Sequence, residues 1–312
     1  MTTVNPHVDI FLTIYSQSER STGGTRGYDP ETYVETKLDH NLIPRILGAK
    51  TKLVILTGNA GDGKTAFIQH IEKIATEKNA RVSQRTDNGC TFSLNGVIYQ
   101  TLYDGSQDFE GTVNDTVLGS FFREMEGERA PQGDFTKVIA INEGKLRDFI
   151  LNKPQYRWLG KQVHDYLNDA DFRPHDTLVF VNLNLRSVVD NTDDGTSIVD
   201  LLLDKLLEPY FWEACTTTPC EDVELCPLRY NVANLSDPKR GQEIRRRLKH
   251  LLLAVHCRKI RHITIHGKFA LKDCVSRLVR FGSCVSSRRR DGYESRVCAS
   301  TLRWIELVSG RS

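Results

Sequence analysis

The chain has 312 residues, of which 39% are hydrophobic and 26% charged, with a formal net charge of +2. These values are ordinary for a globular protein, and a chain of this length can bury a core without disulfides or metals, so composition alone does not indicate a substrate. The N-terminus lacks the basic segment and continuous apolar stretch of a signal peptide, and no apolar run of about 18 residues could span a bilayer. We therefore expect a cytoplasmic protein with no membrane partner, whose eight cysteines are reduced thiols or metal ligands.

Charge is distributed unevenly along the chain. Residues 237–312 hold 19 lysines and arginines against 6 acidic residues, whereas residues 1–236 hold the remaining 23 basic and 34 acidic residues. An acidic body therefore carries a basic C-terminal appendage.

The hydrophobic pattern indicates an α/β fold. Apolar residues at helical spacing predict helices at residues 31–47, 65–78, 115–125, 145–152 and 197–207. Short apolar runs predict buried strands at residues 52–57, 138–141, 178–183 and 263–265. Asn95-Gly96, between two β-prone runs, predicts a hairpin within residues 91–103. Strands that alternate with helices predict a parallel sheet flanked by helices on both faces.

A phosphate-binding motif lies between the strand at residues 52–57 and the helix after it. It fits G-x-x-x-x-G-K-[ST] at every fixed position and comprises Gly58, Asn59, Ala60, Gly61, Asp62, Gly63, Lys64 and Thr65, followed by Ala66. Its glycines let backbone N–H groups turn toward phosphate oxygens, and the helix dipole adds positive potential. Lys64 would reach the β- and γ-phosphates and Thr65 would ligate Mg²⁺. We expect this P-loop (residues 58–65) to bind a nucleoside triphosphate.

Hydrolysis needs a group that orients or deprotonates the attacking water, placed at the end of a neighbouring strand. Glu143 is the candidate, because it follows the apolar run at residues 138–141 and Asn142. Asp104, which follows the β-prone residues 97–103, is the rival carboxylate. A solvated residue at the start of a loop is the alternative interpretation of Glu143.

The segment Val-Ile-Ala-Ile-Asn-Glu, ending in Glu143, resembles the second phosphate-site motif of AAA-type ATPases, four apolar residues followed by Asp-Glu. Asn142 replaces the usual Asp, and the resemblance implies that its amide oxygen holds a water bound to Mg²⁺. It also implies that Asn182 or Asn184 senses the γ-phosphate, and that Arg186 contacts phosphate in its own or a neighbouring subunit. A turn residue and a surface ion pair are the alternatives for these asparagines and this arginine.

The bound base is inferred from an incomplete motif. Residues 152–155 begin like a guanine-reading N-K-x-D motif but lack its Asp, and the similar pattern at residues 36–39 precedes the P-loop and follows no clear strand. We therefore expect ATP rather than GTP.

Several cysteines cluster in the second half of the chain. Zinc takes four N or S ligands in a tetrahedron, and one hypothesis is a zinc site formed by Cys215, Cys220, Cys226 and Cys257. The separations are not those of a C-x₂-C site, so scattered thiols are the other hypothesis.

A basic helix is predicted at residues 239–249, with Asp237-Pro238 at its start. Its basic face would bind DNA or RNA phosphates, or else form a solvated helix face. Beyond it, residues 267–312 show poor periodicity and are interpreted as an extension that folds only with a partner, a truncated end or a non-native sequence.

Four segments resemble the P-loop ATPase modules of large prokaryotic defence proteins: YVETKLDHNLIPRIL, LVILTGNAGDGKTAFIQ, VIAINEGKLRDF and VFVNLNLRSVVD. Such modules occur in ATPase subunits of phosphorothioation-dependent restriction and beside phage-defence kinases. The resemblance covers residues 30–265. It implies an AAA- or STAND-like ATP-driven switch or motor that assists nucleic-acid restriction as a homo-oligomer or within a larger defence complex.

The sequence thus predicts a P-loop NTPase of α/β class with a basic, mainly helical appendage. Its expected regions are a flexible segment at residues 1–30, the NTPase core at 31–210, a Cys-containing basic extension at 211–266 and an irregular basic tail at 267–312. ATPase activity is expected. A small-molecule kinase and a nucleotide-binding interaction module without turnover are the alternatives. A kinase would need a mobile lid over its second substrate, and the sequence shows no clear lid motif. In an interaction module without turnover, Glu143 would be dispensable.

Overall fold

The computed structural model describes residues 33–257, except residues 60, 110, 170, 191–194 and 214–225. The described residues belong to two compact units that divide between Arg186 and Ser187. The predicted N-terminal segment, the strand near residues 263–265 and the tail at residues 267–312 lie outside the described residues. Within the part that is described, no helix is both long and apolar enough to cross a membrane.

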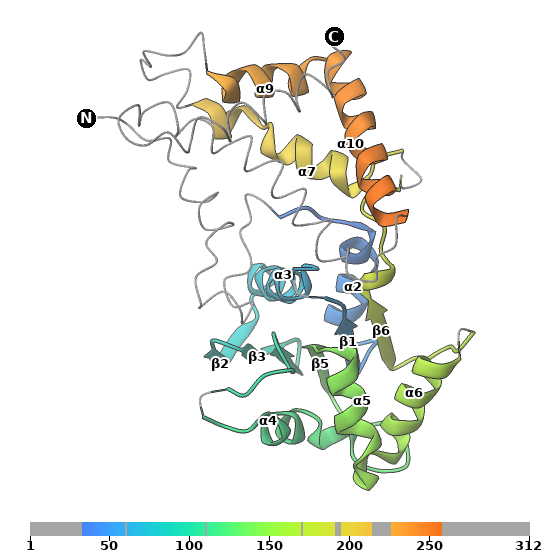
Figure 1. Cartoon of the computed structure of the whole chain (residues 1–312). Helices are drawn as coiled ribbons and strands as arrows, with labels where there is room; N and C mark the ends of the chain where they lie inside the picture. The colour runs from blue at the N-terminus through green and yellow to red at the C-terminus, as the bar shows by residue number, and fades with distance from the viewer. Residues whose placement is uncertain are drawn as a thin grey trace. The chain divides into compact units, whose positions relative to one another are not determined.

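The first unit has an α/β fold built on a mixed six-stranded sheet (Figure 1). Its strands are β1 (Leu53–Thr57), β2 (Arg81–Thr86), β3 (Gly89–Leu94), β4 (Val97–Leu102), β5 (Phe135–Ala140) and β6 (Leu178–Asn182). Its α-helices are α2 (Lys37–Leu47), α3 (Lys64–Glu77), α4 (Asn114–Phe121), α5 (Glu143–Leu151) and α6 (Arg157–Asn168). Short 3₁₀ helices are η2 (Arg123–Met125), η3 (Pro154–Tyr156) and η4 (Leu183–Leu185).

The strand order is β2-β3-β4-β5-β1-β6. β1 pairs in parallel with β5 and β6, and β4 pairs in parallel with β5, whereas β2 with β3 and β3 with β4 are antiparallel. The prediction of a parallel sheet is therefore wrong for β2 and β3. The causes are two tight turns. Asn95 and Gly96, with φ of 53° and 82°, fold β4 back on β3 and confirm the predicted hairpin, and residues 87–88 fold β3 back on β2.

Helices cover both faces of this sheet, as the alternation of strands and helices predicts (Figure 1). Val54 and Leu56 of β1 belong to a core shared with α2 and α3, while Leu53 and Ile55 belong to a core shared with α4, α5 and α6. Successive strand residues point to opposite faces, so a strand buried on both sides is apolar throughout. The sheet is thus fixed on both faces, and its strand ends are where polar residues can gather.

The second unit is helical in its described part. Its elements are α7 (Ile198–Leu206), η5 (Pro209–Trp212), α9 (Pro227–Ser236) and α10 (Arg240–Cys257). Val199 and Leu203 of α7 pack in one cluster with Leu252 of α10. Asp237 Oδ1 accepts hydrogen bonds from the N–H groups of Lys239 and Arg240 at 2.9 and 2.7 Å, so this aspartate caps the predicted basic helix.

Candidate functional site

The P-loop joins the end of β1 to the start of α3, as its motif predicts. Gly58, Gly61 and Gly63 have φ values of 144°, 83° and 85°, which side-chain-bearing residues rarely adopt. A Cβ on Gly58 would also lie 2.8 Å from Asp62 Oδ2 and 3.1 Å from the Cβ of Leu183. Glycine is therefore required at residue 58 by both conformation and space. Ala60 lies outside the described residues.

The Lys64 side chain folds back over the loop. Its Nζ donates hydrogen bonds to the carbonyl oxygens of Gly58 and Asn59, both at 2.8 Å. Burial lowers the pKa of the Lys64 ammonium, and the charges of Asp62 and Asp104 oppose that shift. An ammonium has three N–H donors, so two carbonyl contacts leave one for an anion.

The first turn of α3 is suited to a phosphate. Gly63 precedes the helix, and among the described residues no side chain caps its first N–H groups. Open N–H groups and the positive end of the helix dipole together favour an anion. The residues present therefore fit the triphosphate that the motif predicts, with Lys64 and Thr65 in the first turn of the same helix.

The end of β4 reaches this first turn. Thr65 Oγ1 donates a hydrogen bond to the carbonyl oxygen of Tyr103 at 3.4 Å, and Asp104 follows directly. Asp104 Oδ1 accepts a hydrogen bond from the Ser106 N–H at 2.8 Å, and no described residue donates one to Oδ2. Asp104, the rival carboxylate of the sequence analysis, is thus the neighbour of Tyr103. The Tyr103 carbonyl in turn contacts Thr65, the expected Mg²⁺ ligand.

The ends of β5 and β6 flank the end of β1. Asn142 Oδ1 accepts hydrogen bonds from the N–H groups of Gly144 and Lys145 at 2.8 and 3.4 Å, and so caps α5. Glu143, the first residue of α5, accepts a hydrogen bond from Asn182 Nδ2 at 3.4 Å. Two predicted site residues, Glu143 and Asn182, are therefore brought together, while the amide oxygen of Asn142 is engaged by its own helix.

Asn184 contacts the P-loop directly, because its Oδ1 accepts a hydrogen bond from the Asn59 N–H at 3.1 Å. Arg186 follows η4; burial lowers the pKa of its guanidinium, and the charges of Asp39 and Asp62 are among those that oppose the shift. Among the described residues, no carboxylate lies within ion-pair distance of Arg186 and its buried Nε has no acceptor. A partly buried arginine that has no carboxylate within ion-pair distance in the described part of the chain is suited to an anion.

Three residues that support this site were missed by the sequence patterns: Asn88, Tyr103 and Ser106. Ser106 Oγ accepts a hydrogen bond from the Asn142 N–H at 2.8 Å and so links the ends of β4 and β5. Their types and spacing match no motif. The signal that could have found them was the position of Asp104 after a β-prone run, which marks the end of a strand.

The predicted zinc site cannot be assembled from the described residues. Cys215 and Cys220 and the side chain of Cys257 lie outside them, and Cys226 precedes α9. Within the described ranges no group of three His, Cys, Asp or Glu side chains is placed to hold a metal. The zinc hypothesis stays a prediction.

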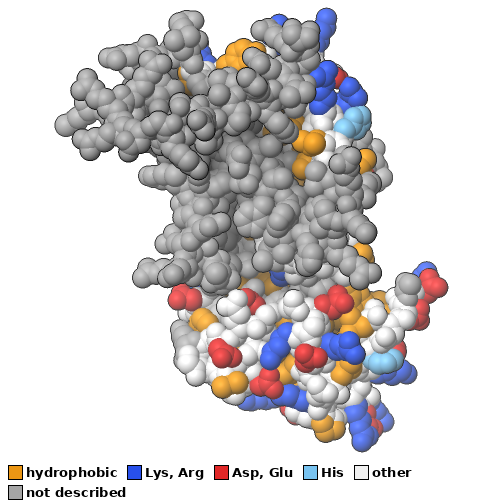
Figure 2. All heavy atoms as spheres, viewed as in Figure 1, with side chains coloured by type: hydrophobic (Ala, Val, Ile, Leu, Met, Phe, Trp, Pro, Cys, Tyr) orange, Lys and Arg blue, Asp and Glu red, His pale blue; other side chains and the backbone are white. Residues whose placement is uncertain are grey.

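The basic side chains of α10 have acidic partners in their own unit. Arg245 lies 2.6 Å from Asp204, and Lys249 lies 2.8 Å from Asp200. Arg246 and Arg247 both contact Glu243, at 2.7 Å. Figure 2 shows Lys and Arg side chains gathered where Figure 1 places α10. Ion pairs within the unit therefore account for part of the basic pattern.

Comparison with known proteins adds no family to this geometry. No protein-family model matches the chain, and no curated protein sequence matches it significantly. The functional interpretation accordingly depends on the residues around the P-loop.

Proposed function

We propose that the chain is a P-loop NTPase that binds and hydrolyses ATP in the presence of Mg²⁺. The observation that carries the proposal is the meeting of α3 and β4: Lys64 and Thr65 open the helix after a glycine loop, Thr65 touches Tyr103, and the charge of Asp104 acts on Lys64. A lysine, a hydroxyl and a carboxylate beside open helix N–H groups are the parts that a metal–triphosphate complex needs.

Each residue of the site has a part in the proposed reaction. Lys64 binds the β- and γ-phosphate oxygens, and Arg186 adds a second positive charge near the P-loop. Thr65 and Asp104 are the residues that would hold Mg²⁺, which when bound neutralises charge on the phosphate oxygens. Asn142 was the sequence-based candidate for that contact, but its oxygen caps α5, so the geometry favours Asp104.

Glu143 is proposed as the group that accepts the proton of the attacking water. It lies at the end of β5, next to β1 in the sheet, and the hydrogen bond from Asn182 directs its carboxylate across the end of β1. Asn184 holds the P-loop backbone through Asn59. A movement of the loop when the γ-phosphate is lost would therefore also move the residues after β6.

We further propose that turnover drives a switch or motor in a nucleic-acid-linked defence process, as a homo-oligomer or within a larger complex. The resemblance of the four segments supports this process, and the basic residues of α10 would supply contacts to DNA or RNA.

The test is hydrolysis of ATP and of GTP by the full chain, with and without DNA or RNA, beside Lys64→Ala. Mg²⁺-dependent release of phosphate from ATP that Lys64→Ala abolishes supports the proposal. Tight ATP binding without turnover would instead indicate an interaction module, and transfer of phosphate to a small molecule would indicate a kinase. Failure to bind any nucleotide overturns the proposal.

A further inference from the structure

Asp104 is held from the β2–β3 turn by one side chain. Asn88 Oδ1 accepts a hydrogen bond from the Asp104 N–H at 2.8 Å, and Asn88 Nδ2 donates one to the Asp104 carbonyl oxygen at 2.9 Å. The backbone carbonyl of Asn88 also accepts from the Tyr103 N–H at 2.8 Å. Asn88 is only 5% exposed. The Asn88 side chain therefore pairs with the N–H and the carbonyl oxygen of Asp104, as the backbone of a neighbouring strand would.

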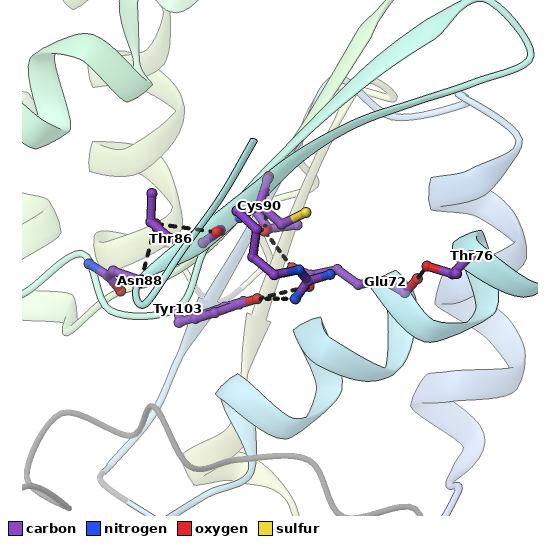
Figure 3. A network of polar contacts seen from close by, with 9 residues as sticks. Glu72, Thr76, Thr86, Asn88, Cys90 and Tyr103 are labelled. Carbon is purple, nitrogen blue, oxygen red and sulfur yellow. Dashed lines mark hydrogen bonds and ion pairs between the residues drawn. The ribbon is translucent and has the colours of Figure 1, made fainter. Parts of the chain in front are cut away.

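A second contact holds Tyr103, the residue before Asp104. The Tyr103 hydroxyl donates a hydrogen bond to Glu72 Oε2 at 2.8 Å, and Arg85 of β2 donates to the same oxygen at 3.0 Å. Thr101 Oγ1 donates to Glu72 Oε1 at 2.6 Å. Figure 3 shows the Tyr103 side chain pointing toward Glu72 of α3.

Glu72 lies about two turns after Thr65 on α3, so both residues face the same neighbour, β4. Burial raises the pKa of the Tyr103 phenol, and the Glu72 carboxylate raises it further, so the phenol keeps its proton and donates at neutral pH. Glu72 is 3% exposed, and a buried carboxylate that accepts three donors, one of them the charged Arg85, forms strong hydrogen bonds. The helix that carries the P-loop residues is thereby fixed to the strand that carries Asp104.

We propose that the β2–β3 hairpin positions Asp104 for Mg²⁺: Asn88 fixes the backbone of Asp104, and Glu72 with Arg85 fixes Tyr103 against the P-loop helix. This inference rests on the proposed function, because it assigns a task to Asp104 that only a metal–nucleotide complex requires. None of the three positioning residues touches nucleotide. Their effect passes through the separation of Asp104 and Thr65, whose hydroxyl already contacts the Tyr103 carbonyl.

The test compares Asn88→Ala with Ser83→Ala in the full chain. Ser83 is in β2 of the same hairpin, and its hydroxyl donates to the Thr91 carbonyl at 3.0 Å without contacting Asn88 or Asp104, so its loss controls for general damage to the hairpin. The ligand-free readout is hydrogen exchange at the Asp104 amide. The second readout is the affinity of a fluorescent ATP analogue, measured in EDTA and then across a Mg²⁺ titration.

We expect faster exchange at Asp104 in Asn88→Ala but not in Ser83→Ala. The Mg²⁺ concentration for half of the effect on nucleotide affinity should rise about tenfold or more, as is usual when a group that supports a metal ligand is removed. Affinity in EDTA should stay within about twofold, since the P-loop itself is unchanged. Tyr103→Phe, which removes one hydroxyl only, should shift the Mg²⁺ dependence in the same direction by less.

The inference is overturned if Asn88→Ala and Tyr103→Phe keep the wild-type Mg²⁺ dependence while wild-type protein binds Mg²⁺ and ATP. It is also overturned if affinity in EDTA falls as much as affinity in Mg²⁺, because the defect would then be one of folding rather than of metal positioning. If Asn88→Ala does not fold, the outcome for Tyr103→Phe decides. Wild-type protein that binds no nucleotide overturns the proposed function itself, which separates the two failures.

Discussion

The Asn59 N–H donates a hydrogen bond to Asn184 Oδ1 at 3.1 Å, joining the P-loop to the turn after β6 across 125 residues of sequence. Asp62 Oδ2 accepts from the same N–H at 2.7 Å. The second residue of the loop is therefore held by one acceptor within the loop and by one after β6. The conformation of the phosphate loop therefore depends on where β6 ends.

Removal of this contact should weaken nucleotide binding without abolishing it. Asn184→Ala deletes one hydrogen bond while Asp62 keeps the other, and one such bond contributes about 0.5–1.5 kcal/mol, or a loss of about 2–10-fold in affinity. Asn168→Ala, which removes an asparagine whose Nδ2 bonds only within α6, is the matched control. Titration with ATP measures both variants, and equal affinities would show that Asn184 does not shape the loop.

Lys64→Ala should abolish hydrolysis and lower ATP affinity about 10–100-fold, because hydrogen bonds to a charged group are stronger than neutral ones. The thermal unfolding midpoint should change little, since the Lys64 ammonium bonds only to loop carbonyls. Lys78→Ala, at the other end of α3, controls for the loss of a lysine from this helix. Wild-type affinity and turnover in a folded Lys64→Ala protein would contradict the P-loop assignment.

The α10 helix provides a test of nucleic-acid binding. Arg246 and Arg247 share Glu243, and their side chains are 56% and 36% exposed, whereas Arg245 is 18% exposed and paired with Asp204. Replacing Arg246 and Arg247 with Gln should weaken binding to all DNA or RNA sequences and reduce the salt dependence of log K by about 2. Glu243→Gln, which removes the carboxylate charge that both arginines contact, should act in the opposite direction. Wild type and the double variant binding equally at low salt would exclude this role.

Features with a local signal were predicted well from the sequence. The P-loop is a fixed motif, and the runs that became β1, β5 and β6 are apolar because those strands are central or covered on both faces. The hairpin at Asn95-Gly96 was predicted because a two-residue turn with positive φ favours these residue types.

Features that depend on long-range pairing were not predicted. Every residue of β2 is exposed except the intermediate Thr86, so this edge strand has no apolar alternation to reveal it. The environments of Asp104 and Glu143 also could not be separated, because which strand lies next to β1 is decided by packing and not by local sequence. Asp104, which follows the Tyr103 carbonyl that Thr65 contacts, comes after β4, the strand whose role the sequence left open.

The second unit should lose stability in acid through Asp200. Burial raises the pKa of this carboxyl, but hydrogen bonds from Lys249 and Ser197 outweigh burial and lower it overall. Since the folded pKa lies below the unfolded value of about 3.9, the stabilisation is full above that value and is lost as pH falls through the folded pKa.

Asp200→Asn should therefore lower the free energy of unfolding by about 1–3 kcal/mol at pH 7 and flatten its acid dependence. Asp204→Asn is the control, because Asp204 is 59% exposed and its pair with Arg245 is worth less. Denaturant unfolding compares the two variants across about pH 3–7, a range that includes the ordinary pKa values of carboxyl groups. Equal losses in both would show that Asp200 has no special part in holding α7 to α10.

Glu143→Gln should leave ATP and Mg²⁺ bound but slow hydrolysis by about 10²–10⁴-fold, because glutamine keeps the size of the side chain and cannot accept the proton of water. Asp104→Asn should act differently. It removes a negative charge one residue after the Tyr103 carbonyl that Thr65 contacts, so it should raise the Mg²⁺ requirement as well as lower the rate. Single-turnover hydrolysis measured across a Mg²⁺ titration separates a loss of the base from a loss of the metal.

The hydrogen bond from Asn182 to Glu143 offers a control, since Asn182→Ala releases the Glu143 carboxylate without deleting it and should slow hydrolysis by less than Glu143→Gln. A solvated carboxylate with no catalytic part would cost almost nothing in rate when neutralised. If Glu143→Gln hydrolyses ATP at the wild-type rate while Asp104→Asn does not, the proton acceptor lies at the end of β4. The residues after β5 would then supply the Asn142 cap of α5 and no proton acceptor.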